Sequence, residues 1–207
     1  MTIKFSFLKI GITGGIGCGK SEVSKMLRTA GIPIIPADLL ARNLMNADES
    51  IRARLKLEFG EDIYAGDGLL NRAKVAEIIF NDKFAKEKIE QIVHPKVIEY
   101  EHRLLDKIQQ SGKFKIAAVE AALIFEAGSE KYLDYVIVVA ASKETIIQRL
   151  KTRDGFNTEQ IEKRLQSQMP LAEKINRADY VIQNNGSQKE LENEVVKLIE
   201  WLKNKIE

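Results

Sequence analysis

The chain has 207 residues, of which 44% are hydrophobic and 30% charged, and this composition is typical of an ordinary soluble globular protein. The formal net charge is only +2, so no global field draws the protein to nucleic acid or to an anionic membrane. The single cysteine, Cys18, excludes an internal disulfide and a multi-cysteine metal site. No apolar run approaches the roughly 20 residues that span a bilayer, and the N-terminus lacks the features of a signal peptide. We therefore expect a cytoplasmic protein.

The first elements of the chain are a strand, a glycine-rich loop and a helix. Residues 5–13 are apolar and rich in β-formers, which predicts a buried strand, and residues 20–29 carry apolar side chains at helical spacing. Gly31 would end this helix. The run IPII that follows is short and β-branched, and a further helical pattern opens near Asp38. Two strand-to-helix junctions therefore lie in the first 40 residues.

The middle of the chain, from Asp38 to about Gln110, is mainly helical in pattern, with a turn region over 60–68. We expect helices over residues 40–57, 72–80 and 83–108. A proline inside a helix removes one hydrogen bond, so Pro95 should break or kink the last of them.

Strands and helices alternate in the rest of the chain. Strands are expected from residue 115 and over 135–141 and 178–184, and helices over 143–151 and 188–205. This alternation is typical of a parallel sheet with crossover helices. A polar segment dense in charge, residues 154–177, is inserted between two of these elements. The sequence thus indicates one α/β core with two insertions.

The stretch GGIGCGKS, residues 14–21, matches the pattern GxxxxGK[ST] between a predicted strand and a predicted helix, as that motif requires. Backbone N–H groups can surround a polyphosphate only where the loop adopts positive φ angles with no Cβ in the way, which glycine permits. The following helix directs its N-terminal amides at the same anion. Lys20 can reach the β- and γ-phosphates, and the Ser21 hydroxyl can ligate Mg²⁺. The motif predicts binding of ATP or a similar nucleotide.

Cys18 lies inside this loop. It is either a thiolate stabilised by the helix N-terminus or, as we favour, a small side chain where serine would serve equally.

Other residues separate the classes of protein that use such a loop. A GTP switch needs an Asn-Lys-x-Asp base reader, and the Asn-Lys pair here, Asn204-Lys205, is at the C-terminus and followed by Ile-Glu. A transporter ATPase would show a Ser-Gly-Gly-Gln signature, which is missing. A kinase remains.

Asp38 and Glu120 follow two predicted strands, at the edge where open α/β sheets bind ligands. Asp38 could accept the proton of a substrate hydroxyl that attacks the γ-phosphate, and it could also cap the helix that follows. Glu120 could hold Mg²⁺ through water or be a solvated strand-end residue.

Basic residues mark the second insertion. Arg149 and Arg153 share one helix face and could neutralise the transferring phosphoryl group, with Arg164, Lys174 and Arg177 further on. If this insertion acts as a lid, its closure would exclude water from the site. The alternative is a solvated helix paired with Asp154, Glu159 and Glu162. His94, before Pro95, is either a ligand contact or a helix boundary, and His102 is most simply a surface residue.

Seven stretches, in order, resemble the dephospho-CoA kinase family over nearly the whole chain: GITGGIGCGKSEVSKML, IIPADLLAR, IVHPKV, EAALIFEAG, QRLKTRDG, RLQSQMPLAEK and ADYVIQNNG. The resemblance implies a P-loop NTPase three-layer fold with a five-stranded parallel sheet. It also implies transfer of the γ-phosphoryl group of ATP to the 3′-hydroxyl of the dephospho-CoA ribose. The partners would be ATP and dephospho-CoA, with Mg²⁺, and no nucleic acid or membrane; the protein would be a monomer or a weak homo-oligomer.

The resemblance also implies domains and site residues. The nucleotide-binding core would take residues 1–37, 111–153 and 178–207, the helical acceptor domain 38–110, and the lid 154–177. Catalytic roles fall to Asp38, Lys20 and Arg149, and the metal contact to Ser21. Nucleotide contacts are expected at Gly14, Gly15, Ile16, Gly17, Cys18, Gly19, Lys20, Ser21, Glu22, Arg153, Asn184, Asn185 and Gly186, and acceptor contacts at Asp38, Arg42, His94 and Glu120.

Two positions depart from the family pattern. Pro36 stands where the family commonly has an aspartate, and Glu22 where it commonly has threonine. The sequence leaves two alternatives: a kinase for another small acceptor such as a nucleoside monophosphate, and a nucleotide-dependent binding module without acceptor chemistry.

Overall fold

The computed structural model describes residues 7–206, without the side chains of residues 80, 81 and 83. The chain forms two compact units. The core unit takes the described residues up to Pro36 together with those from Leu104 onward, and the helical unit is Ala37–Arg103.

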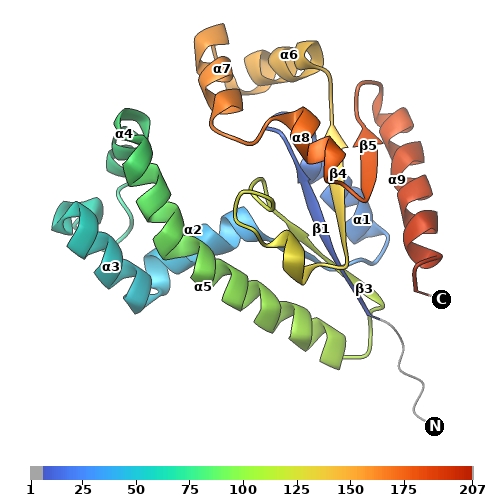
Figure 1. The fold of residues 1–207 in the computed structure, drawn as a ribbon, viewed down its shortest axis with the longest axis horizontal. Helices are drawn as coiled ribbons and strands as arrows, with labels where there is room; N and C mark the ends of the chain where they lie inside the picture. Colours follow the sequence, from blue (N-terminus) through green and yellow to red (C-terminus); the bar gives the residue numbers. More distant parts are fainter. Residues whose placement is uncertain (1–6, 207) are drawn as a thin grey trace. The chain divides into compact units, whose positions relative to one another are not determined.

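The core unit contains a five-stranded parallel sheet (Figure 1). Its strands are β1 (Leu8–Gly14), β2 (Ile34–Pro36), β3 (Ile116–Glu120), β4 (Tyr135–Ala140) and β5 (Tyr180–Gln183). Their order is β2-β3-β1-β4-β5, so the central strand β1 pairs with β3 on one side and β4 on the other. The predicted α/β fold with a five-stranded parallel sheet is confirmed. The first two residues of the strand expected over 5–13 lie outside the described residues.

The sheet is buried on both faces. Along β4, Ile137 and Val139 belong to one apolar cluster, and Val136 and Val138 belong to another. Because successive side chains of a strand point to opposite faces, the two clusters lie on the two sides of the sheet. This explains why β4 is a continuous apolar run instead of an alternating one.

Helices of the core unit cover these faces: α1 (Lys20–Thr29), α6 (Lys143–Asp154), α7 (Thr158–Gln166), α8 (Leu171–Asn176) and α9 (Gln188–Lys203), with a short 3₁₀ helix η2 (Glu130–Tyr132). α1 and α9 pack against each other and contribute to the cluster around Ile137 and Val139. α8 packs on β4 beside Val136 and Val138. Because the five strands are parallel, their carboxyl ends lie at one edge of the sheet, and the loops that follow them lie at the same edge.

The helical unit contains α2 (Ala37–Ala47), α3 (Glu49–Phe59), η1 (Glu61–Ile63), α4 (Arg72–Asn81) and most of α5 (Lys83–Gln110). The single helix expected over 40–57 is wrong, because the chain starts a new helix after Asp48. The Asp48 carboxylate accepts the N–H groups of Ser50 and Ile51, as an N-cap does.

The break expected at Pro95 is also wrong, since α5 continues through it. Pro95 is exposed, so water can satisfy the carbonyl that loses its partner. Ile92, Val93 and Val97 are buried around it, and this packing holds the helix together despite the proline. Among the helices of residues 7–206, none is both long and apolar enough to cross a bilayer.

Candidate active site

The phosphate loop, residues 14–19, runs from the end of β1 to the start of α1 in the core unit. Gly14 and Gly19 have φ angles of +147° and +94°. A Cβ on Gly14 would lie 2.2 Å from the Val139 carbonyl oxygen, and a Cβ on Gly19 would lie 2.2 Å from Asn184 Nδ2. Glycine is therefore required at both positions for close approach of the neighbouring chain as well as for backbone conformation.

Lys20 begins α1 and folds back over the loop. Its Nζ donates to the carbonyl oxygens of Gly14 at 3.0 Å and Gly15 at 3.1 Å. The residue before it, Gly19, offers no side-chain cap, and the first N–H groups of a helix have no partner inside the helix. The loop thus joins an ammonium group to a row of amide donors, which is an arrangement suited to a polyphosphate.

Ser21 and Glu120 meet beside the loop. Ser21 Oγ donates to Glu120 Oε1 at 3.1 Å, and Glu120 is the last residue of β3. Hydroxyl and carboxylate oxygens are ligands that Mg²⁺ accepts. Within residues 7–206 no group of three or more His, Cys, Asp or Glu side chains could hold a metal ion by itself. The two oxygens therefore fit a Mg²⁺ ion that takes its other ligands from phosphate and water.

Arg149 and Asn184 hold the far side of the loop. The Arg149 guanidinium lies 3.5 Å from the carbonyl oxygens of Gly17 and Cys18 and donates to Asn184 Oδ1 at 3.2 Å. Asn184 Nδ2 donates to the Cys18 carbonyl at 2.8 Å, and this side chain is buried. Contacts with the loop backbone and with Asn184 therefore hold Arg149 beside the phosphate loop.

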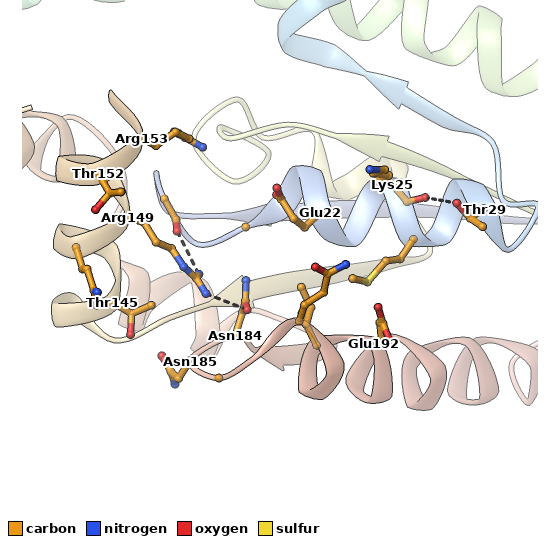
Figure 2. A pocket seen from close by; sticks show the side chains of 17 residues that line it. Glu22, Lys25, Thr29, Thr145, Arg149, Thr152, Arg153, Asn184, Asn185 and Glu192 are labelled. Atoms are coloured by element: carbon orange, nitrogen blue, oxygen red, sulfur yellow. Dashed lines mark hydrogen bonds between the residues drawn. The ribbon is translucent and has the colours of Figure 1, made fainter. Parts of the chain in front are cut away.

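A cavity of about 1040 Å³ opens next to these groups and is lined by the phosphate loop, α1, α6, α9 and residues 184–186. Figure 2 shows Arg149 reaching from α6 toward the loop and Asn184, with Glu22 and Lys25 on α1 and Asn185 after β5. Asn185 Oδ1 accepts the Ser142 N–H at 2.6 Å, which ties the start of α6 to this wall. The cavity is large enough for a nucleotide.

Arg153 also lines the cavity, but its guanidinium is held by the adjacent residue. It donates to both carboxylate oxygens of Asp154, with distances of 2.8–3.1 Å. This hydrogen bonding raises the pKa of Arg153, and Asp154 in turn has a lowered pKa. Arg149 and Arg153 therefore differ: the first is bound to the phosphate loop and the second to its own helix end.

Cys18 is fully buried. Burial raises the pKa of its thiol above the ordinary value, against the opposing effect of the Lys20 charge. Burial thus favours the neutral thiol, in keeping with a small apolar side chain at this place in the loop.

The predicted acceptor residues Asp38, Arg42 and His94 lie in the helical unit, where Arg42 is exposed and His94 half-buried. Asp38 lies in the first turn of α2, which begins at Ala37, so it is not the cap of that helix. Glu101 on α5 is buried in the same unit. Burial raises the pKa of Glu101 to about 7, and the charge of Asp38 adds to this effect.

Sequence reasoning did not find the contacts of two residues of the core unit. Lys174, named above only among the basic residues of the second insertion, is completely buried and pairs with Glu126 at 2.8 Å. Gln168 accepts an N–H group of the phosphate loop. Their one signal in the sequence was the segment RLQSQMPLAEK, which contains both.

Known proteins resemble this chain over most of its length. A family model described as dephospho-CoA kinase matches residues 8–190. The dephospho-CoA kinase of Syntrophotalea carbinolica is 41% identical over 192 residues, which cover 93% of this chain and 90% of that protein. A crystal structure of a protein from Thermus thermophilus matches with a TM-score of 0.77 and 34% identity, covering 95% of this chain and 98% of that one. The dephospho-CoA kinase structure from Campylobacter jejuni matches with a TM-score of 0.70 and 28% identity over 94% and 96% of the two chains.

Proposed function

The chain belongs to the dephospho-CoA kinase family, and from this premise we propose that it transfers the γ-phosphoryl group of ATP to the 3′-hydroxyl of the dephospho-CoA ribose, the last step of CoA biosynthesis. The bond between the γ-phosphorus and the β,γ-bridging oxygen breaks, and a bond from that phosphorus to the 3′-oxygen forms. The products are ADP and CoA. The observation that carries the proposal is the phosphate loop with Lys20 folded over it and Arg149 bound to its far side.

The core unit supplies the donor side of the reaction. The loop amides from Gly14 to Gly19 and the N–H groups of Lys20, Ser21 and Glu22 would surround the phosphates, and Lys20 would exchange its two carbonyl acceptors for phosphate oxygens. Arg149 would neutralise charge on the transferring group. Asn184, Asn185 and Gly186 would face the adenine, with Arg153 at the cavity wall.

Ser21, with Glu120 beside it, would hold Mg²⁺, which neutralises phosphate charge when it is bound. Glu120 could equally contact the acceptor. The protein's own contribution is the pairing of these two oxygens, which keeps both next to the loop before any ligand arrives.

The helical unit would supply the acceptor side. Asp38 would take the proton of the 3′-hydroxyl as that oxygen attacks, and its place two residues after β2 along the chain supports this role. Arg42 and His94 would bind the acceptor. The division into a core of 1–37, 111–153 and 178–207, an acceptor domain of 38–110 and a lid of 154–177 stays a prediction, as do the cytoplasmic location and the monomeric or weakly associating state.

An ADP-release assay across a panel of acceptors tests the proposal. The panel consists of dephospho-CoA, AMP, CMP, UMP, dTMP and shikimate, each with ATP and Mg²⁺, and EDTA in place of Mg²⁺ as the metal control. We expect turnover with dephospho-CoA alone. Turnover only with a nucleoside monophosphate would mean that this compound, and not dephospho-CoA, is the acceptor. ATP binding with no acceptor phosphorylated would indicate a binding module.

A further inference from the structure

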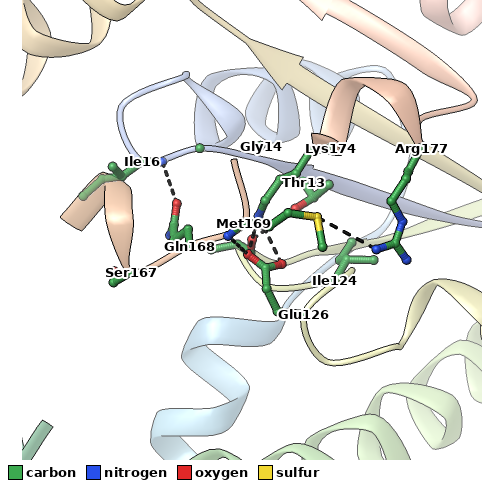
Figure 3. A network of polar contacts seen from close by, with 12 residues as sticks. Thr13, Gly14, Ile16, Ile124, Glu126, Ser167, Gln168, Met169, Lys174 and Arg177 are labelled. Atoms are coloured by element: carbon green, nitrogen blue, oxygen red, sulfur yellow. Dashed lines mark hydrogen bonds and ion pairs between the residues drawn. The ribbon is translucent and has the colours of Figure 1, made fainter. Parts of the chain in front are cut away.

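A closed ring of polar contacts links the phosphate loop to two other segments of the core unit (Figure 3). These are the loop after β3, which contains Ala122 and Glu126, and the return segment, residues 167–174, which follows α7 and enters α8. None of these contacts has a role in the function proposed above.

The first half of the ring starts at the end of β1. Thr13 Oγ1 donates to the Ala122 carbonyl oxygen at 3.2 Å, and Lys174 Nζ donates to the same oxygen at 2.6 Å. Lys174 also pairs with Glu126, whose Oε1 lies 2.8 Å away. Because Lys174 is completely buried, its ammonium group needs these acceptors in place of water. The contacts fix the return segment against the loop after β3.

The second half of the ring returns to the phosphate loop. Glu126 Oε1 accepts the Met169 N–H at 2.8 Å. The Glu126 carboxylate therefore holds the return segment at two points, the Lys174 side chain and the Met169 backbone. The next residue back, Gln168, directs its side-chain carbonyl at the loop and accepts the Ile16 N–H at 3.1 Å. Figure 3 shows Gln168 pointing at Ile16 from below the loop, with dashed lines that join Glu126 to Met169 and to Lys174.

The ring therefore fixes an amide that the loop itself leaves without a partner. Inside the loop, Lys20 Nζ holds the carbonyl oxygens of Gly14 and Gly15, and the Cys18 N–H donates to the Gly15 carbonyl at 3.3 Å. Ile16 projects its N–H away from these contacts. The Ile16 N–H lies in the same peptide plane as the Gly15 carbonyl, so Gln168 holds one end of a plane whose other end binds Lys20 Nζ and the Cys18 N–H. Once Lys20 exchanges this carbonyl for phosphate, Gln168 and the Cys18 N–H are left to hold the plane.

We propose that Gln168 is a positioning residue for phosphoryl transfer: it orients the Gly15–Ile16 peptide of the phosphate loop, and Lys174 and Glu126 hold Gln168 in place. This inference rests on the function proposed above and deepens it, because it assigns to the return segment a part in donor binding. Phosphoryl transfer depends mainly on positioning and on aligned hydrogen-bond donors, so a loop with one peptide plane loose loses rate more than it loses fold.

Two variants of Gln168 separate the acceptor atom from the bulk of the side chain. Gln168→Met keeps the length and removes the acceptor, while Gln168→Glu keeps an acceptor oxygen at the same place. Gln109→Met, on the exposed end of α5, is the control for the exchange of glutamine for methionine. All three are compared with the wild type in kcat, in KM for each substrate and in ADP affinity by calorimetry, after a thermal melt confirms folding.

We expect Gln168→Met to lower kcat roughly 10- to 100-fold and to weaken ADP binding, while KM for dephospho-CoA changes by less than about twofold. Gln168→Glu should keep kcat at saturating ATP within about threefold of the wild type, because the Ile16 N–H keeps its acceptor. Gln109→Met should match the wild type. Equal losses of kcat in the Met and Glu variants, or unchanged kinetics in Gln168→Met, would overturn the proposal.

A competing role for Gln168 makes the opposite prediction. If its carbonyl only occupies the loop until phosphate displaces it, Gln168→Met should bind ADP more tightly than the wild type, and that result also overturns the proposal. In the wild type, hydrogen exchange of the Ile16 amide should stay slow when ADP binds, and faster exchange would mean displacement. ADP affinity and Ile16 exchange need no acceptor, so they test Gln168 even if the chain phosphorylates a compound other than dephospho-CoA.

Discussion

Replacing Glu101 with glutamine should stabilise the helical unit at high pH and not at low pH. Glu101 is 6% exposed, and burial raises the pKa of its carboxyl from 4.5 to about 7. At about 1.4 kcal/mol for each pH unit, this rise corresponds to about 3 kcal/mol of folding free energy. The contribution is fully present below pH 4.5, where folded and unfolded states are both protonated. It is lost as the pH rises to 7, because only the unfolded state ionises freely.

Glutamine has the same shape and no charge to bury, so the stability of Glu101→Gln should not fall over this range. We expect the variant to gain up to about 3 kcal/mol over the wild type at pH 8 and close to nothing at pH 4.5. Hydrogen exchange of the α5 amides between pH 4.5 and 8, corrected for intrinsic exchange rates, reports unfolding of this unit. Glu99→Gln is the matched control. Its carboxyl is exposed and has a lowered pKa from the hydrogen bond with Lys96, so no gain should appear at high pH. A difference between Glu101→Gln and wild type that does not change with pH would refute the reasoning.

Three further substitutions test the proposed site. Asp38→Asn should lower turnover roughly 10²- to 10⁴-fold, nearer the lower figure, with ADP affinity and melting temperature nearly unchanged; undiminished turnover would remove Asp38 from the mechanism. Arg149→Ala should lower kcat roughly 10²-fold and ATP affinity much less, measured by steady-state kinetics and calorimetry, whereas equal losses would indicate ground-state binding. Gly14→Ala should destabilise the core unit by about 2–4 kcal/mol in thermal melts, because its Cβ would meet the Val139 carbonyl oxygen; an unchanged melting temperature would contradict this.

The parts of the fold that could be predicted are those encoded by neighbouring residues. The phosphate loop, α1 and the buried strand β4 each carry their signal within about ten residues, through glycine spacing, helical period or a continuous apolar run. The same holds for Glu120, whose position at a strand end was visible before its contact with Ser21. Local signals therefore located the phosphate loop and the residues beside it.

What could not be predicted depends on partners far along the chain. Gln168 meets Ile16 across 152 residues, and Lys174 is buried only because Ala122 and Glu126 supply acceptors. The sequence pattern around Lys174 suggested a solvated charged helix, and tertiary contacts overrode it. Pro95 shows the same effect in the helical unit, where packing on both sides of the proline keeps α5 continuous.

A crystal structure with a non-hydrolysable ATP analogue, Mg²⁺ and dephospho-CoA bound tests the central claim most directly. The quantity to measure is the distance from the ribose 3′-oxygen to the nearest carboxylate oxygen of Asp38, with the analogue's phosphates on the loop. We predict hydrogen-bond reach, about 2.6–3.2 Å, with the γ-phosphorus in line with the 3′-oxygen. A 3′-hydroxyl that lies far from Asp38, or a nucleotide bound away from Lys20 and Ser21, would contradict the account.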